Sequence, residues 1–228
     1  MLRAFSLTGE GQFSMEVYIY PLNPILYDTD IRFEVPSIRA QREFAYTLIS
    51  FREFPEVLSL ALKLHFRKPL SEVDMLWLKE LAEAAGWSIE DVVDELENLH
   101  RDPSERVERY KVLFEKLYGE ALNLVEKDTV QAAEKMWGAI TALIKLHASL
   151  RRIPLIHWTH DKLYNYVANN VEREYREIFK NLLRAGEPLH RHFYEKGLDP
   201  EAFKEYWSDA VRLVEEARKI VFELMKQG

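Results

Sequence analysis

Residues 128–150 have the sequence DTVQAAEKMWGAITALIKLHASL, and the fold prediction starts from them. Asp128 is a favourable helix N-cap, and Gln131 three positions later completes a capping-box pattern. Apolar residues then recur at steps of three and four, and residues 136–144 are apolar or small on nearly every side. Because such a helix belongs in a protein interior, the stretch predicts the central helix of a helical bundle.

The composition of the 228-residue chain is that of an ordinary globular protein. It is 47% hydrophobic and 30% charged, which suits one large domain, or a smaller one with an extension. The net charge of −7 argues against a general nucleic-acid coat protein, but it leaves room for a local basic site. The chain has no cysteine, which excludes disulfides, zinc–thiolate sites and thiol catalysis. Abundant charge without cysteine fits a soluble protein of a thermophile.

No segment of the sequence predicts a secretory signal or a membrane anchor. The first residues, MLRAFSLTGEGQF, lack the apolar core of a signal peptide. No stretch approaches about 18 uncharged apolar residues, because Lys63 and Lys145 interrupt the best candidates. We therefore expect a cytoplasmic protein without a membrane partner.

Two parts of the chain differ in the period of their apolar residues. Residues 15–20 and 31–35 are rich in β-branched and aromatic side chains and are separated by a proline-containing loop, which predicts a small β-hairpin. After this segment the period is helical. We predict a β-containing N-terminal extension with helices over residues 1–68, and an all-α, antiparallel up-and-down bundle over residues 69–228.

Capping and stop signals divide the helical part of the chain. The expected helices cover approximately residues 37–52, 55–66, 71–85, 88–100, 102–124, 128–150, 163–182 and 200–224. A two-residue link precedes the central helix, so that helix and its predecessor must run antiparallel. The helices at 71–85 and 88–100 have helix-turn-helix spacing, but the second is strongly acidic and DNA phosphates would repel it. A helical hairpin of the bundle is the favoured interpretation.

The histidines hold most of the remaining chemical information. The sequence has no phosphate-binding glycine loop, no GxSxG elbow and no HExxH motif. His157 and His160 have the spacing of two metal ligands, but no acidic partner beyond Asp161 is evident. Surface or capping roles are therefore favoured, and we predict no metal and no cofactor. His147 lies on the apolar face of the central helix, which predicts a hydrogen-bonded core histidine.

The densest group of chemically active side chains falls within eleven residues near the end of the chain. It contains Arg184, His190, Arg191, His192 and Tyr194. Metal-free RNA cleavage uses these residue types, because a neutral imidazole can take the 2′-hydroxyl proton and a guanidinium can hold the phosphate. In the alternative interpretation, Leu189 and Phe193 form a core stripe and the polar residues are its solvated side.

Geometry restricts how this group can meet. At about 100° per residue, Arg184 and His190 point about 120° apart on one straight helix. They converge if Gly186 and Pro188 break the helix, so that a new helix starts at the proline. His190 and Tyr194 are four residues apart and share a face in either case.

Three segments resemble a known protein family. Residues 132–148, AAEKMWGAITALIKLHA, resemble the motif helix of the archaeal PaREP proteins. Residues 158–167, WTHDKLYNYV, resemble the segment that follows it, and residues 189–203, LHRHFYEKGLDPEAF, resemble the second signature of the family. The resemblance covers about residues 70–224, with the motifs in the same order.

This resemblance implies the HEPN (higher eukaryote and prokaryote nucleotide-binding) superfamily, an up-and-down bundle of four or five helices that usually dimerises. Many members are metal-independent endoribonucleases with an arginine, four to six residues and then a histidine, paired across the dimer. Arg184 and His190 have that spacing, although Ala185 stands where a polar residue usually follows the arginine. His192 and Tyr194 have the His-x-Tyr form of a toxin subgroup, but no arginine lies five residues before His192.

The sequence therefore predicts a HEPN-type homodimer that engages RNA or a nucleotide, with metal-independent endoribonuclease activity of toxin or defence type as its catalytic form. His190 would be the general base or a hydrogen-bond donor to the phosphate, and Arg184 or Arg191 would bind the phosphate. Tyr194 would orient the substrate through its hydroxyl or stack on a base through its ring. Arg191 and His192 would contact the RNA. The alternative is a non-catalytic dimerisation or antitoxin-like module for a protein partner, favoured by the negative charge and the aromatic-rich N-terminal region. The sequence leaves open whether the chain is an enzyme.

Overall fold

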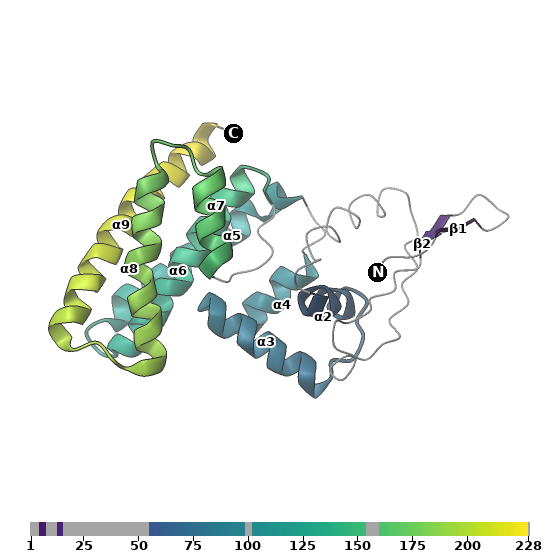
Figure 1. The fold of residues 1–228 in the computed structure, drawn as a ribbon, viewed down its shortest axis with the longest axis horizontal. Coiled ribbons are helices and arrows are strands. Elements are labelled where there is room, and N and C mark those ends of the chain that lie inside the picture. The colour runs from purple at the N-terminus through teal and green to yellow at the C-terminus, as the bar shows by residue number, and fades with distance from the viewer. Residues whose placement is uncertain (1–4, 8–12, 16–54, 99–101, 154–159, 228) are drawn as a thin grey trace. The chain divides into compact units, whose positions relative to one another are not determined.

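The structure is a computed structural model, and helices dominate the part of the chain that it describes (Figure 1). None of the helices in that part is both long and apolar enough to cross a lipid bilayer. The described residues are 5–7, 13–15, 55–98, 102–153 and 160–227. The helices are α2 (Pro55–His65), α3 (Glu72–Ala85), α4 (Ile89–Glu97), the 3-10 helix η2 (Pro103–Arg106), α5 (Val107–Leu124), α6 (Thr129–Leu150), α7 (His160–Asn170), α8 (Arg176–Glu195) and α9 (Pro200–Gln227).

Two short strands lie near the N-terminus. Strands β1 (Phe5–Leu7) and β2 (Phe13–Met15) pair in an antiparallel two-stranded sheet. The hairpin predicted at residues 15–20 and 31–35 lies outside the described residues apart from its first residue, which ends β2. The helix predicted at residues 37–52 also lies outside them.

The chain forms two compact units. The first comprises residues 1–74 and 94–100, and the second residues 75–93 and 101–228. Within the first unit, the ammonium group of Lys63 on α2 donates to both carboxylate oxygens of Asp74 at 2.9 and 3.0 Å. Burial opposes ionisation of Asp74, but hydrogen bonds from Lys63 and Ser71 hold its pKa below the usual value.

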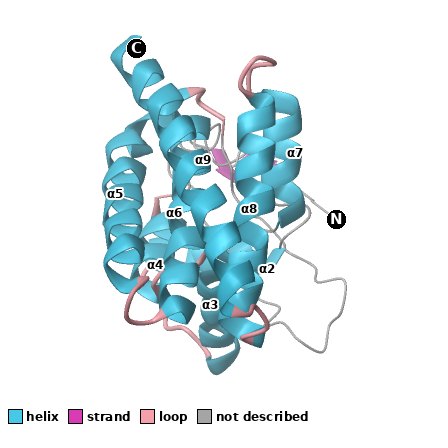
Figure 2. Ribbon diagram, turned by 90° about the vertical axis from the view of Figure 1, so that its left-hand side faces the viewer, coloured by secondary structure: helices cyan, strands magenta, loops and turns pink. Residues whose placement is uncertain are grey.

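In the second unit, α6 is the central helix of a bundle, as the sequence predicts. It packs against α5, α7, α8 and α9, and α8 packs against both α7 and α9. Figure 2 shows these helices running alongside one another. Every residue of α6 from Ala132 to Ser149 is buried except the half-buried Lys135. The predicted N-cap is also confirmed, because the Asp128 carboxylate accepts a hydrogen bond from the backbone N–H of Gln131 at 3.0 Å.

Close backbone contact joins α6 to the turn after α3. Gly86 in this turn has a φ of +66°, the left-handed conformation that favours glycine at a helix end. A Cβ on Gly138 would overlap the carbonyl oxygen of Gly86. The indole N–H of Trp87 donates to the carbonyl of Gly138 at 3.1 Å, and that of Trp137 donates to the carbonyl of Ala84 at 3.0 Å. Two glycines therefore allow the contact, and two tryptophans hold it.

The single helix predicted over residues 163–182 is wrong, because α7 ends at Asn170 and α8 begins at Arg176. The guanidinium of Arg176 donates to the carbonyl of Val171 at 3.0 and 3.3 Å. The backbone N–H groups of Tyr175 and Arg176 both donate to the carbonyl of Glu172. These bonds stabilise a turn across which the apolar residues keep their helical spacing, so periodicity alone could not detect it.

Helix α8 continues without interruption through Gly186 and Pro188. Pro188 lacks a backbone N–H, so the carbonyl of Arg184 loses its normal helical donor, yet the helix persists. Gly186 serves packing rather than a break. A Cβ there would come within 2.6 Å of Ile140 Cδ1 and 3.0 Å of Trp137 Cε3. The break that would bring Arg184 and His190 together is therefore absent from α8.

Candidate functional site

His190 lies where α8 faces α6, and its ring is held on two sides. Its Nδ1 is 3.0 Å from Oε2 of Glu134, and both side chains are nearly covered, with 9% and 11% of their surfaces exposed. The ring stacks on Trp137, with centroids 5.0 Å apart and an interplanar angle of 23°. Because an ionised carboxylate can only accept, it holds the proton of a neutral ring on Nδ1 and leaves Nε2 as the basic atom.

Glu134 comes from α6 and, like Lys145 of the same helix, is a charged residue buried inside the bundle. Burial raises the pKa of the Glu134 carboxyl above its usual value, while the hydrogen bond with His190 opposes this rise. Glu83, whose negative charge also raises this pKa, lies on α3. A buried carboxyl bonded to a nearly buried imidazole is a typical arrangement for proton transfer, although structural pairs also perturb pKa values.

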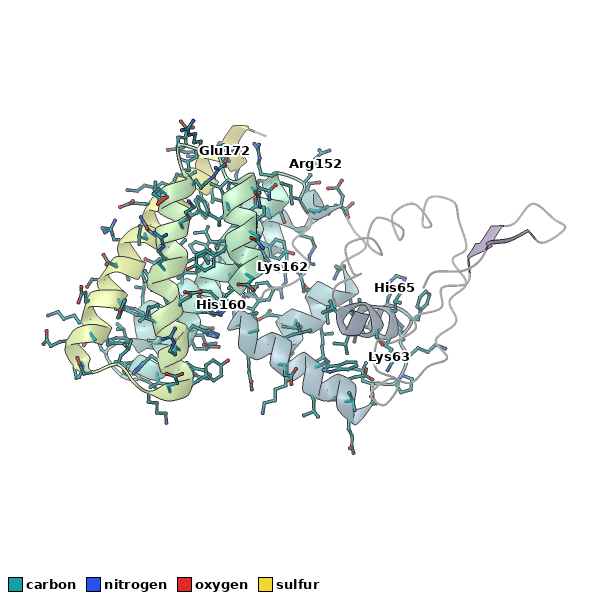
Figure 3. The ribbon with its side chains drawn as sticks, in the orientation of Figure 1. Lys63, His65, Arg152, His160, Lys162 and Glu172 are labelled. Atoms are coloured by element: carbon teal, nitrogen blue, oxygen red, sulfur yellow. The ribbon has the colours of Figure 1, made fainter. Side chains whose placement is uncertain are left out.

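His160, the first residue of α7, forms a second pair of the same kind. Its Nδ1 is 2.8 Å from Oε1 of Glu187 on α8. Its ring centroid is 4.8 Å from that of Trp137 and 5.5 Å from that of His190. The side chain is 39% exposed, so His160 is the more accessible of the two imidazoles. Figure 3 labels it near the lower end of α7.

These residues form one group, which we call the histidine cluster: Glu134, Trp137, His160, Glu187 and His190. Trp137 is its centre, because both imidazole rings contact an indole that is itself fully buried. The indole N–H is fixed by the carbonyl of Ala84, so the ring cannot rotate without losing that bond. The cluster therefore presents two carboxylate-bound imidazoles against one rigid aromatic surface.

Two tyrosines border the histidine cluster. Tyr194 is 47% exposed and meets the His190 ring edge-on at 5.1 Å, as their shared helix face predicts. Burial, with the negative charges of Glu134 and Glu83, raises the pKa of Tyr194 above its usual value. Burial, together with the charge of Glu187 and a hydrogen bond to it, raises the pKa of Tyr164 to about 12. Both phenols are therefore neutral donors near neutral pH.

Arg184 is not brought together with His190. Its side chain is 62% exposed and donates to Oδ1 of Asn181 at 3.1 Å. On the unbroken α8 the two residues point about 120° apart, and Glu187 lies about 60° from each of them. The positive charge of Arg184 acts on Tyr164 of α7. Arg184 thus lies on the α7 side of α8, on the side of Glu187, which pairs with His160, rather than on the side where His190 pairs with Glu134.

Arg191 and His192 lie on another side of α8, beside the turn into α9. Nδ1 of His192 accepts a hydrogen bond from the backbone N–H of Leu198 at 3.1 Å, and its ring packs against Phe203 at 5.5 Å. Burial lowers the pKa of His192, which favours the neutral ring. An open cavity of about 240 Å³ lies here, lined by Pro188, Arg191, His192, Glu195, Gly197, Leu198 and Tyr206. His192 therefore holds the turn, while Arg191 is exposed.

The remaining histidine predictions have separate outcomes. His157 lies outside the described residues. Within the described ranges, no group of three or more histidine, aspartate or glutamate side chains could hold a metal ion. His147 is confirmed as a hydrogen-bonded core histidine, because it is fully buried and its Nδ1 is 2.6 Å from the hydroxyl of Tyr166.

Sequence reasoning missed both carboxylates of the cluster and the position of His160 beside His190. Glu134 and Trp137 are three residues apart on α6, and Glu187 and His190 are three residues apart on α8. This spacing places each pair on one helix face. The sequence therefore contained a signal within each helix, but not the contact between the helices.

Comparison with protein families gives a match in the second compact unit. Residues 109–214 match the family model described as the Archaeal PaREP1/PaREP8 family. This span is narrower than the predicted 70–224, and it contains all five residues of the histidine cluster. Neither the curated proteins nor the solved structures include a match to the chain. The predicted resemblance to the archaeal PaREP proteins is confirmed over residues 109–214, which match this family model.

Proposed function

We propose that the chain is a HEPN-type protein that engages RNA at the histidine cluster and cleaves it without a metal. The observation that carries this proposal is the pair of Glu134 and His190, a carboxylate-held imidazole beside a second imidazole. The up-and-down packing of α5, α6, α8 and α9 and the family match support the HEPN type. The two strands near the N-terminus support a β-containing extension. We also propose a homodimer, following the family resemblance, and keep the cytoplasmic location that the sequence analysis predicts.

The proposed reaction is attack of a ribose 2′-hydroxyl on the adjacent phosphorus. Nε2 of neutral His190 takes the hydroxyl proton, and the 2′-oxygen forms a bond to phosphorus while the bond to the 5′-oxygen breaks. The products are a 2′,3′-cyclic phosphate and a 5′-hydroxyl. Glu134 keeps the His190 ring in the reactive tautomer and stabilises the imidazolium that forms.

Binding groups surround this reaction centre. Arg184 has an exposed guanidinium on the α7 side of α8, where it would hold a phosphate at the edge of the cluster. Tyr194 is half-exposed next to His190, so its ring offers a surface on which an RNA base can stack. Arg191 and His192 face the cavity near α9, where Arg191 would contact the RNA outside the reaction centre.

A non-catalytic interaction module is the second candidate, and particular observations favour it. His190 is only 9% exposed. Glu134 places negative charge beside it, and the negative charge of Glu83 acts on both Glu134 and Tyr194, which opposes an approaching phosphate. On α3, Met75 and Leu76 are 45% and 60% exposed, and exposed apolar side chains of this size are suited to a protein partner.

The test is cleavage of a labelled single-stranded RNA pool in the presence of EDTA. Wild type is compared with His190→Ala, and with His65→Ala as a matched histidine variant outside the cluster. We expect cyclic-phosphate ends with wild type and His65→Ala, and their loss with His190→Ala. No cleavage of any RNA by wild type would overturn the enzyme and favour the interaction module. Cleavage that survives in His190→Ala would show that another residue is the base.

A further inference from the structure

The proposed cleavage needs a second proton carrier. One proton leaves the 2′-hydroxyl while another must reach the departing 5′-oxygen, because an alkoxide is a poor leaving group in water. His190 cannot accept one proton and supply the other in the same step. A group that donates a proton must therefore approach the phosphate from another direction.

His160 has the attachment that a proton donor requires. Its Nδ1 is bound to Glu187 at 2.8 Å, so Nε2 is the ring nitrogen that remains for a substrate. A carboxylate accepts a hydrogen bond from the Nδ1–H of the ring, so Glu187 fixes the direction in which Nε2 points. The face of Trp137, 4.8 Å away, gives the imidazolium a second favourable neighbour. Its 39% exposure, against 9% for His190, also leaves the ring open to water and to substrate.

The separation and origin of the two rings suit one phosphodiester. Their centroids are 5.5 Å apart with an interplanar angle of 45°. The attacking and leaving oxygens lie on opposite sides of phosphorus, so base and acid must reach it from different sides. His190 comes from α8 and His160 from α7, and Trp137 keeps both rings in place. Each Nε2 needs to come within about 2.6–3.2 Å of its oxygen in the bound complex.

We propose that His160 is the general acid of this cleavage and that Glu187 is its positioning carboxylate. The inference rests on the proposed ribonuclease function. His160 Nε2–H gives its proton to the 5′-oxygen as the bond between phosphorus and that oxygen breaks. At the same time His190 Nε2 receives the 2′-hydroxyl proton. Exchange with water then returns a proton to His160 and removes one from His190, which balances the cycle.

The test uses an RNA in which sulfur replaces the 5′-oxygen at a single cleavage site. A thiolate leaves without a donated proton, because the pKa of a thiol, about 8.5, is far below that of an alcohol. Rates are measured in EDTA for wild type, His160→Ala, His160→Gln and His190→Ala, on this RNA and on the unmodified RNA. We expect both His160 variants to lose about 10²–10⁴-fold on unmodified RNA and to approach wild type on the sulfur substrate. His190→Ala should lose activity on both.

Each other outcome has a distinct meaning. If the wild-type protein cleaves neither RNA, both the proposed function and this inference are overturned. Wild-type cleavage with full activity of both His160 variants on unmodified RNA overturns the inference alone. Equal loss on both substrates would show that His160 does not protonate the leaving group. Thermal melts of each variant are recorded first, so that rates are compared only between folded proteins.

Discussion

Two histidine sites lie near opposite ends of α7, and they differ in how completely the protein surrounds the ring. Figure 3 labels His160 at one end and Glu172, the neighbour of His147, at the other. Nδ1 of His147 is 2.6 Å from the Tyr166 hydroxyl and its Nε2 is 3.4 Å from Oε2 of Glu172. Protein groups therefore face both of its nitrogens. For His160 the described contact, with Glu187, engages one nitrogen, and the ring is partly exposed.

The comparison separates a histidine that the protein encloses from one that is partly exposed. Both sites pair an imidazole with a glutamate, so residue types alone would rank them equally. His147 is fully buried, and its ring centroid lies 5.1 Å from that of Phe179. Its neighbour Glu172 is neutralised by Arg151, whose Nη1 is 3.0 Å from Oε1 of the glutamate. A ring closed in this way cannot reach a substrate. The predictions below test this difference, from the largest expected effect to the smallest.

Changing the glutamate that holds His190 in the histidine cluster and the glutamate beside His147 should affect the proposed RNA cleavage very differently. Glu134→Gln should lower the cleavage rate by about 10²–10⁴-fold, because an amide no longer holds His190 in the reactive tautomer. Glu172→Gln should leave the rate close to wild type. The measurement is single-turnover cleavage of labelled RNA in EDTA. Equal losses in the two variants would contradict the distinction between the sites.

Alanine substitutions at His147 and His160 should differ in the opposite direction when stability is measured. The His147 site, where we expect little effect on cleavage, should show the larger loss of stability. His147→Ala removes a fully buried ring and leaves the Tyr166 hydroxyl without its partner, so the free energy of unfolding should fall by about 2–4 kcal/mol. His160→Ala removes a partly exposed ring and should cost less than about 1 kcal/mol. Denaturant unfolding at pH 7.5 measures both. A larger loss for His160→Ala would show that the exposed site is the structural one.

Two helical glycines test whether the cluster depends on tight packing. Gly186→Ala would press a methyl group against Ile140 and Trp137, so the free energy of unfolding should fall by about 1–3 kcal/mol. Gly119→Ala is the control, because nothing lies within 4 Å of its Cβ position. That change should raise the free energy of unfolding by about 0.5–1 kcal/mol through lower backbone entropy of the unfolded chain. A stabilising Gly186→Ala would show that Trp137 can move.

Part of the pH dependence of stability should come from the buried His147. Burial lowers the pKa of His147 below 6.5, although Glu172 opposes the shift. Below pH 6.5 the unfolded chain therefore takes up this proton before the folded chain does, and stability falls as the pH falls. His147→Gln should reduce this dependence, while His192, whose pKa is also lowered, still contributes in the same direction. Denaturant unfolding between pH 7.5 and 5.5 measures the slope, with His160→Gln as the control.

Features that depend on neighbouring residues could be predicted from the sequence. Asp128 caps α6, Gly86 ends α3 and Pro200 begins α9, as their local signals indicate. The central position of α6 also followed from its composition, because a helix apolar on nearly every side must be covered by others. His147 was predicted as a core histidine for the same reason.

Features that depend on contacts between distant segments could not be predicted from the sequence. The bond between His160 and Glu187 joins positions 27 residues apart, and that between Glu134 and His190 joins positions 56 apart. Arg184 and His190 were the expected pair because their spacing matched a family motif. On the continuous α8 they point apart, and the side chains that meet His190 come from α6 and α7 instead.

The sequence by itself determined most of the helices in the described part of the chain, which helix is central and which residue types are available for chemistry. Those properties follow from caps, periodicity and composition, and each acts over a few residues. Only the tertiary structure decided which imidazole meets which carboxylate. It also decided that the ring of His147 is fully buried while that of His160 is partly exposed. Helix packing sets these distances, because it depends on side-chain shapes at the contact between helices, such as Trp137 against the space left by Gly186.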